Sequence, residues 1–203
     1  WLYLNLPDKD VIVSCNGLKM LVRNPRVSTI GRSIYKTGVW EPDVTNFILS
    51  KLKPNMKTLD IGAATGYYSI LFAKNIGPNG KVFAFEPIPE AKKYLDQNIS
   101  MNGLDNVISY DFALFDKSGN VVLENPFIQS KINLSKKNLS KNDIRVKMKV
   151  FDQWKLDKGI DDSIDLIKLD VEGAELNVLK GAEKTIKQFN PNLAISVYHS
   201  KAD

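Results

Sequence analysis

Apolar and polar positions recur with two different periods along this chain, and each period predicts a type of element. Alternation by twos over residues 11–22, interrupted by Asn16 and Gly17, predicts a tight β-hairpin, because both turn residues tolerate positive φ. Residues 41–52 carry a proline near their start and apolar residues spaced by three and four, which predicts a helix. We expect its apolar face to contain Val44, Phe47, Ile48 and Leu52.

Downstream of this helix, short apolar runs alternate with helical patterns. The runs predict strands at 58–63, 81–87, 107–114, 119–125, 144–154, 164–173 and 192–200. The helical patterns lie at 66–76, 89–103 and 174–189. Such an order predicts an α/β fold in which a doubly wound, mostly parallel sheet carries helices on both faces. We divide the chain into an N-terminal hairpin appendage, residues 1–35, and a main domain, residues 36–203.

Composition and single residues exclude several kinds of site. The 203 residues suit one compact domain, and no apolar run approaches the roughly 18 residues of a membrane span. One cysteine excludes an internal disulfide and a cysteine metal cluster, and one histidine excludes a site built on several histidines. We therefore predict no metal site and a reducing, cytoplasmic setting. The chain begins with Trp1, so a removed leader remains an open alternative.

The net charge of +5 is concentrated in one segment. Residues 131–149 contain seven Lys or Arg and one Asp, together with many Asn and Ser. We interpret this segment as a solvated basic loop that continues into a polar strand. A flexible flap that meets an acidic substrate is the alternative. We do not expect a nucleic-acid surface, because no aromatic residues that could stack on bases are interleaved with the lysines.

The expected sheet places its ligand at one edge. In open parallel sheets, ligands bind beyond the carboxyl ends of the strands, near the point where the strand order reverses. The residues that directly follow the predicted strands should therefore form the site. They are Asp60 to Gly66, Glu86, Asp111 to Ala113, Asp170 to Glu175, and His199.

The glycine turn after the first of these strands discriminates between ligands. Its spacing differs from a phosphate-binding P-loop, and Ala64 stands where a dinucleotide fold has its second glycine. Asp60 adds negative charge where phosphates would lie, which favours a ligand with a cationic part, and S-adenosylmethionine fits. Glu86, 20 residues after Gly66, can accept hydrogen bonds from both ribose hydroxyls, but an NAD site requires the same acid. A tight turn without a ligand is the remaining alternative.

Three segments carry a resemblance to a known family. They are "GVWEPDVTNFILSKLKPNMKTLDIGAATGYYSILFA", "KVFAFEPIPEAKKYLDQNISMNG" and "IDLIKLDVEGAELNVLKGA", of which "KLDVEGAE" is the most specific part. The chain resembles the FkbM family of S-adenosylmethionine-dependent methyltransferases from about Gly38 to His199. The resemblance implies the class I methyltransferase fold and O-methylation of sugars, glycans or natural products. Strands 6 and 7 of that fold are missing from the sequence, so we expect truncation at both ends.

The resemblance also assigns residues to the cofactor. Asp60, Gly62 and Gly66 would line it, Glu86 would bind the ribose, and Asp111 to Ala113 would meet the adenine edge. Glu41 would face the methionine end. The full set that we predict for S-adenosylmethionine is Glu41, Asp60, Gly62, Ala63, Gly66, Tyr68, Glu86, Pro87, Asp111, Phe112, Ala113 and Asp170.

Methyl transfer requires an acceptor that is oriented and deprotonated. The candidate catalytic residues are therefore groups near the ligand that can accept a proton. Asp170 and His199 end neighbouring strands, and a histidine with an ordinary pKa near 6.5 suits proton acceptance. Glu172 is the third candidate. Asp170 could instead cap the following helix, and Asp170, Glu172 and Glu175 could hold Mg²⁺.

We expect a small-molecule or glycan substrate and make no prediction of the oligomeric state. Three alternatives stay open for the activity. One is methylation of nitrogen or of a carboxylate. Another is RNA methylation, which the pI of about 9.1 suggests. The third is a cofactor-binding domain without turnover.

Overall fold

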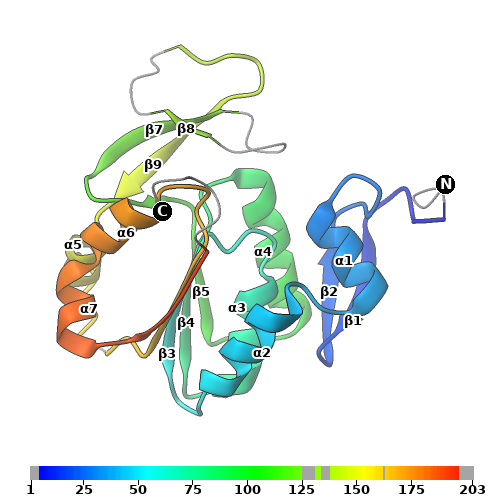
Figure 1. The fold of residues 1–203 in the computed structure, drawn as a ribbon, viewed down its shortest axis with the longest axis horizontal. Helices are drawn as coiled ribbons and strands as arrows, with labels where there is room; N and C mark the ends of the chain where they lie inside the picture. Colours follow the sequence, from blue (N-terminus) through cyan, green and yellow to red (C-terminus); the bar gives the residue numbers. More distant parts are fainter. Residues whose placement is uncertain (1–4, 125–130, 134–137, 162, 197–203) are drawn as a thin grey trace.

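The computed structural model describes residues 5–124, 131–133, 138–161 and 163–196, and a parallel sheet of five strands lies at its centre (Figure 1). The strand order is β11-β10-β3-β4-β5. These strands are β3 (Lys57–Ile61), β4 (Lys81–Phe85), β5 (Val107–Tyr110), β10 (Leu166–Leu169) and β11 (Asn192–Ile195). From β3, the next strands along the chain, β4 and β5, lie on one side. β10 and then β11 lie on the other side of β3, so the strand order reverses between β3 and β10. The predicted doubly wound α/β fold is confirmed.

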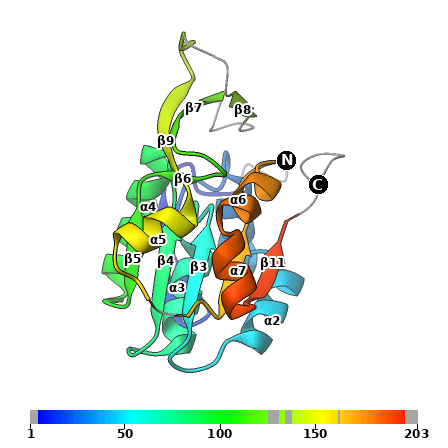
Figure 2. The same cartoon turned by 90° about the vertical axis from the view of Figure 1, so that its left-hand side faces the viewer.

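Helices cover both faces of this sheet, as Figures 1 and 2 show from two sides. One face carries α2 (Pro42–Lys51), α3 (Tyr67–Ile76) and α4 (Pro89–Met101). The other carries α5 (Phe151–Asp157), α6 (Glu175–Gly181) and α7 (Glu183–Phe189). Because side chains alternate along a strand, Leu59 and Ile61 pack with α5, α6 and α7, whereas Thr58 and Asp60 face the opposite side.

The N-terminal hairpin packs beside α3 and α4. Strands β1 (Val11–Cys15) and β2 (Leu18–Val22) pair antiparallel around Asn16 and Gly17, both with positive φ, as the sequence predicts. Asn98 of α4 accepts a hydrogen bond from the backbone of Leu21 and donates one back. An unpredicted helix, α1 (Thr29–Thr37), follows the hairpin. It crosses the boundary that we set at residue 35, and the division into domains stays a prediction.

A second sheet stands above the carboxyl edge of the first (Figure 1). Its order is β6-β9-β7-β8, with β6 (Ala113–Leu114), β7 (Gly119–Glu124), β8 (Lys131–Asn133) and β9 (Ile144–Lys149). The basic segment 131–149 therefore contributes two strands of this sheet. In β9, Val146 and Met148 are buried while Arg145 and Lys147 are exposed, so the cations alternate onto the solvent face.

Two predicted strands are shorter than expected. The strand predicted at 107–114 divides, because β5 pairs with β4 whereas β6 leaves the central sheet to pair with β9. The strand predicted at 144–154 ends at Lys149, and α5 begins two residues later. Phe151, Trp154 and Lys155 of α5 are buried together, which is a helical spacing that the preceding alternation conceals.

Two helix predictions also need correction. The helix predicted at 174–189 is two helices joined at Ala182, next to Gly181. A Cβ on Gly181 would lie 2.2 Å from the carbonyl oxygen of Phe115, so glycine fits at this point and a larger residue would clash. In α2 the predicted apolar face is only half right: Ile48 is buried and Leu52 packs against the core, as predicted, whereas Val44 and Phe47 are exposed and Thr45 is buried instead.

Within the described residues, none of the helices combines the length and the apolar character that crossing a membrane requires. The cytoplasmic location stays a prediction.

Candidate functional site

A cavity of about 320 Å³ lies beyond the carboxyl ends of β3, β4 and β10. Helix α4, β6 and β7 supply much of its remaining wall. Several residues that the sequence predicted for the cofactor or for catalysis line it: Gly62, Glu86, Pro87, Phe112, Ala113, Asp170 and Glu172. Others stand outside its lining: Glu41, Asp60, Ala63, Gly66, Tyr68 and Asp111. His199 lies outside the described residues, and all of these roles stay predictions.

The charged residues that line the cavity are mostly acidic. The lining contains one guanidinium, that of Arg23, and four carboxylates, which belong to Glu86, Glu90, Asp170 and Glu172. Arg23 itself makes an ion pair with Glu90 over 3.3 Å. This wall therefore favours a ligand with a cationic part over one that carries phosphates, since like charges at short range repel.

Glu86 follows β4, and backbone groups of two segments hold its carboxylate. Its two oxygens accept the backbone N–H groups of Ala64 and Ile88, each over 2.8 Å. The side chain is buried, and burial raises the pKa of Glu86 to about 7, although the two N–H groups oppose the rise. Glu86 thus ties the glycine turn to the start of α4 and titrates near neutral pH.

Asp60, at the end of β3, lies beneath the cavity rather than in its wall. It is fully buried, and the hydroxyl of Ser69 donates to its Oδ2 over 2.6 Å. Its Oδ1 has no hydrogen-bond partner among the described residues. Burial raises the pKa of Asp60, and the charge of Lys168 on the neighbouring strand opposes that rise.

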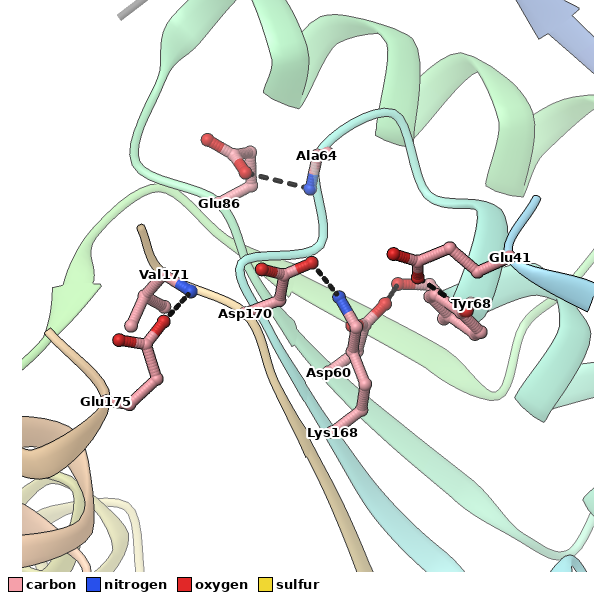
Figure 3. Close-up of polar contacts among 10 residues, drawn as sticks. Glu41, Asp60, Ala64, Tyr68, Glu86, Lys168, Asp170, Val171 and Glu175 are labelled. Carbon is pink, nitrogen blue, oxygen red and sulfur yellow. Dashed lines mark hydrogen bonds and ion pairs between the residues drawn. The ribbon is translucent and has the colours of Figure 1, made fainter. Parts of the chain in front are cut away.

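Lys168 was not among the residues predicted from the sequence, yet it lies close to Asp60 and Asp170 (Figure 3). Its ammonium lies 3.3 Å from Oδ2 of Asp170 and 4.9 Å from the ring centroid of Tyr68. The Tyr68 hydroxyl donates to Glu41 over 3.0 Å, so Glu41, Tyr68, Lys168 and Asp170 form a chain of contacts. A lysine within a four-residue apolar strand was the signal that could have identified it.

Close backbone packing explains the first glycine of the turn. Gly62 has φ of +80°, and a Cβ there would lie 1.9 Å from the carbonyl oxygen of Asp170. The turn after β3 and the end of β10 therefore touch through their backbones. Gly66 similarly faces Leu95 of α4, whose Cδ1 would lie 2.7 Å from an added Cβ. Both glycines thus have a packing role whatever they contact in a ligand.

Unfavourable backbone conformations gather at this edge. Six described residues other than glycine have positive φ, and three of them are asparagines, which tolerate it. The other three are Glu41, Ala64 and Glu172, with φ of 43°, 48° and 58°. Each belongs to a segment next to the carboxyl ends of β3 and β10. Strain of this kind concentrates at functional sites, where the surrounding structure enforces it.

Replacing Ala64 with glycine should stabilise the protein. Glycine adopts the left-handed conformation without a Cβ penalty, so we expect Ala64→Gly to raise the free energy of unfolding by about 1 kcal/mol. The matched control is Ala63→Gly, because Ala63 is buried and should lose about 1 kcal/mol of stability. Urea denaturation measures both. If the Ala64→Gly protein is less stable than the wild type, the backbone at Ala64 is not strained.

The start of α6 does not support a capping role for Asp170. The N-cap of α6 is Ala174, so Asp170 does not cap this helix. Glu175 accepts the backbone N–H of Val171 over 3.0 Å and thereby closes the turn after β10. Among the residues that the structure describes, no group of three or more His, Cys, Asp or Glu side chains is placed to hold a metal ion.

A comparison with known families matches most of the chain. The model of the Methyltransferase FkbM domain matches residues 60–203. The chain belongs to the FkbM methyltransferase family. S-adenosylmethionine is the cofactor of this family and of this FkbM domain.

Curated relatives and solved structures agree with this assignment. The 2-O-methyltransferase NoeI of Sinorhizobium fredii is 31% identical over 150 residues, 66% of this chain and 60% of NoeI. The hexuronic acid methyltransferase AglP of Haloferax volcanii is 27% identical over 150 residues, 74% of this chain and 59% of AglP. The chain thus spans about three fifths of the length of these relatives. An FkbM methyltransferase from Methylobacillus flagellatus shares the fold, with a TM-score of 0.52, 19% identity, and coverage of 89% of this chain and 53% of that one.

The FkbM domain offers groups that fit this cofactor. A buried carboxylate that titrates near neutral pH, Glu86, is suited to accept ribose hydroxyls. Apolar side chains such as Phe112 and Ile88 line the same cavity and suit a nucleoside base. Its acidic wall suits the ammonium and sulfonium, which are the cationic groups of S-adenosylmethionine.

Proposed function

We propose that this FkbM domain transfers a methyl group from S-adenosylmethionine to a hydroxyl of a sugar, glycan or natural-product acceptor. The observation that carries the proposal is the cavity beyond β3, β4 and β10, whose wall has four carboxylates and one guanidinium. Such a wall suits a cationic nucleoside and not a dinucleotide. The names of two relatives support parts of this proposal: 2-O-methyltransferase NoeI supports transfer to an oxygen, and hexuronic acid methyltransferase AglP supports a sugar acceptor.

Each part of the cofactor has a proposed set of contacts. Glu86 accepts the ribose hydroxyls, and Pro87 adjoins it. The adenine edge meets Asp111, Phe112 and Ala113. The glycine turn, with Gly62, Ala63 and Gly66, lies along the methionine part, and Asp60 acts from beneath the cavity through its charge. Asp170 binds the ammonium, and Glu41 and Tyr68 support that end through their mutual hydrogen bond.

The protein then needs to orient the acceptor and remove its proton. The bound cofactor supplies an activated methyl group on a positive sulfur. Because a sugar hydroxyl is a weak nucleophile while protonated, a carboxylate near it assists by accepting the proton. Asp170 and Glu172 both line the cavity and are our candidates for this role, with His199 as the third. Orientation within the cavity contributes the larger part, about 7 to 11 kcal/mol in favourable cases.

Calorimetric titration with S-adenosylhomocysteine and with NAD tests the cofactor assignment. We expect the chain to bind S-adenosylhomocysteine and to bind NAD at least about a hundredfold more weakly, because the acidic wall repels a diphosphate. Tighter binding of NAD would contradict the proposed ligand chemistry.

An acceptor panel with methyl-labelled S-adenosylmethionine tests the reaction. We expect label in sugars or glycans, at an alkali-stable ether, and not in peptides with free carboxylates or amines. Alkali-labile label would indicate a methyl ester and support the carboxylate alternative. Label in RNA, with binding that weakens steeply as salt rises, would support the RNA alternative. Binding without label in any acceptor would favour a domain that holds the cofactor without turnover.

A further inference from the structure

A buried lysine beneath the cavity has no role in the assignments above. Lys168 is 5% exposed and lies in β10, whose four residues are all buried. A charged group in such a place is unfavourable unless it is paired, and an apolar residue would pack there at lower cost. Packing alone therefore does not explain why the position carries an ammonium.

The register of the sheet explains which groups surround this ammonium. Lys168 lies directly opposite Asp60 in the pairing of β10 with β3, so the two side chains are on the same face. Asp170 directly follows β10, two residues beyond Lys168, and its Oδ2 is 3.3 Å from the ammonium. The strands thus place one cation between two carboxylates (Figure 3).

Groups from other elements complete its surroundings. From α3, the ring of Tyr68 packs against the ammonium at 4.9 Å, and its hydroxyl donates to Glu41 at the start of α2. Burial raises the pKa of Tyr68, so its hydroxyl stays protonated and keeps this bond. From β4, Glu86 is close enough for the charge of Lys168 to oppose the rise in its pKa.

We propose that Lys168 is a positioning residue for the cofactor site: its ammonium, 3.3 Å from Oδ2 of Asp170, holds the Asp170 carboxylate at the cavity wall. Lys168 does not line the cavity, whereas Asp170 does, so Lys168 acts through Asp170. The inference rests on the proposed binding of the cofactor's ammonium by Asp170. Without the lysine, the Asp170 carboxylate would lose the group that fixes its position and would stand near the buried Asp60 with no cation between them.

The test uses Lys168→Met, which keeps the length of the side chain and removes its charge. We expect S-adenosylhomocysteine to bind about tenfold more weakly at pH 7, because the Asp170 carboxylate is no longer held where it meets the ligand's ammonium. Lys168→Arg retains the charge and should restore affinity to within about threefold of the wild type.

Two controls separate this role from a general loss of stability. Lys155→Met removes another buried lysine, which packs over the ring of Phe189 on α7 and lies away from the cavity lining. This variant should leave the affinity for S-adenosylhomocysteine unchanged. If Lys168→Met does not fold, Lys168→Gln replaces it in the same measurements.

Asp170→Asn separates two possible failures: that Lys168 does not position Asp170, and that Asp170 does not bind the cofactor's ammonium. We expect Asp170→Asn to weaken S-adenosylhomocysteine binding, and Lys168→Met to add little on that background, because both act on one carboxylate. If Asp170→Asn weakens binding but Lys168→Met does not change the affinity, the inference is wrong and the assignment of Asp170 survives. If neither substitution changes binding, both are wrong.

Discussion

Glu86→Gln should bind S-adenosylhomocysteine about a hundredfold more weakly than the wild type. Two hydrogen bonds from ribose hydroxyls to an ionised carboxylate are lost or weakened, and each contributes roughly 1.5 kcal/mol. In the free protein, Glu86 also accepts the N–H groups of Ala64 and Ile88, so the substitution loosens the turn that borders the cavity. Calorimetric titration at pH 8, where the wild-type carboxylate is ionised, measures the difference.

The pH dependence of binding provides a sharper signature of the same residue. The pKa of Glu86 is about 7 in the free protein, and ribose hydroxyls donate to the ionised form. Binding should therefore release protons near pH 7 and weaken by up to about tenfold per pH unit below it. Titrations in two buffers that differ in ionisation enthalpy measure this release. It should be absent from Glu86→Gln.

The stability of the free protein should change with pH in the opposite direction to its ligand affinity, and Glu86 is the cause of both. An acid with a raised folded pKa binds more protons in the folded state than in the unfolded state. Its contribution to stability is full below the unfolded value of 4.5 and is lost as pH rises through about 7. Glu86→Gln should remove this part of the pH dependence.

Glu183→Gln is the matched control for these measurements, because Glu183 is exposed on α7 in an ion pair with Lys187. Its affinity and proton release should equal those of the wild type. If Glu86→Gln also behaves like the wild type, Glu86 does not bind the ribose.

Gly62→Ala should lower the free energy of unfolding by about 3 kcal/mol. The added Cβ would lie 1.9 Å from the carbonyl oxygen of Asp170, and the backbone φ of +80° is strained for any residue with a side chain. Backbone atoms cannot turn aside as a flexible side chain can, so the ends of β3 and β10 must separate. We combine about 1 kcal/mol of conformational cost with about 2 kcal/mol of overpacking. Urea denaturation measures the loss.

Gly103→Ala isolates the conformational part of that effect. Gly103 also has positive φ, of +60°, but an added Cβ there would meet nothing within 4 Å. This variant should lose about 1 kcal/mol. Equal losses for Gly62→Ala and Gly103→Ala would mean that the close approach of the two strand ends is not important for stability.

Much of the fold follows from local pattern. A strand whose two faces are buried and a helix with one apolar stripe leave different periods in the sequence, so the order of strands and helices could be predicted. The parallel sheet then follows from that order, and the edge that carries the ligand follows from the sheet. Gly62, Glu86 and Asp170 were found because each directly follows a strand.

Some boundaries could not be predicted because distant contacts decide them. The strand at 107–114 divides where β6 changes partner from the central sheet to β9. The helix at 174–189 divides where Gly181 meets the backbone of Phe115. In α2, Val44 and Phe47 have the residue type of a buried face, but the packing of the helix leaves them exposed. No local pattern contains the partner in any of these contacts.

The sequence by itself determined the fold class and the family, and it predicted the sheet edge at which the cavity lies. The tertiary structure decided which polar residues lie in the cavity wall and which lie beneath it. Asp60 and Glu86 both end strands, but Glu86 faces the cavity while Asp60 is sealed under it beside Lys168. The reason is physical: burial and charge pairing depend on strand register and on helices packed from elsewhere in the chain, so they arise only when the chain has folded.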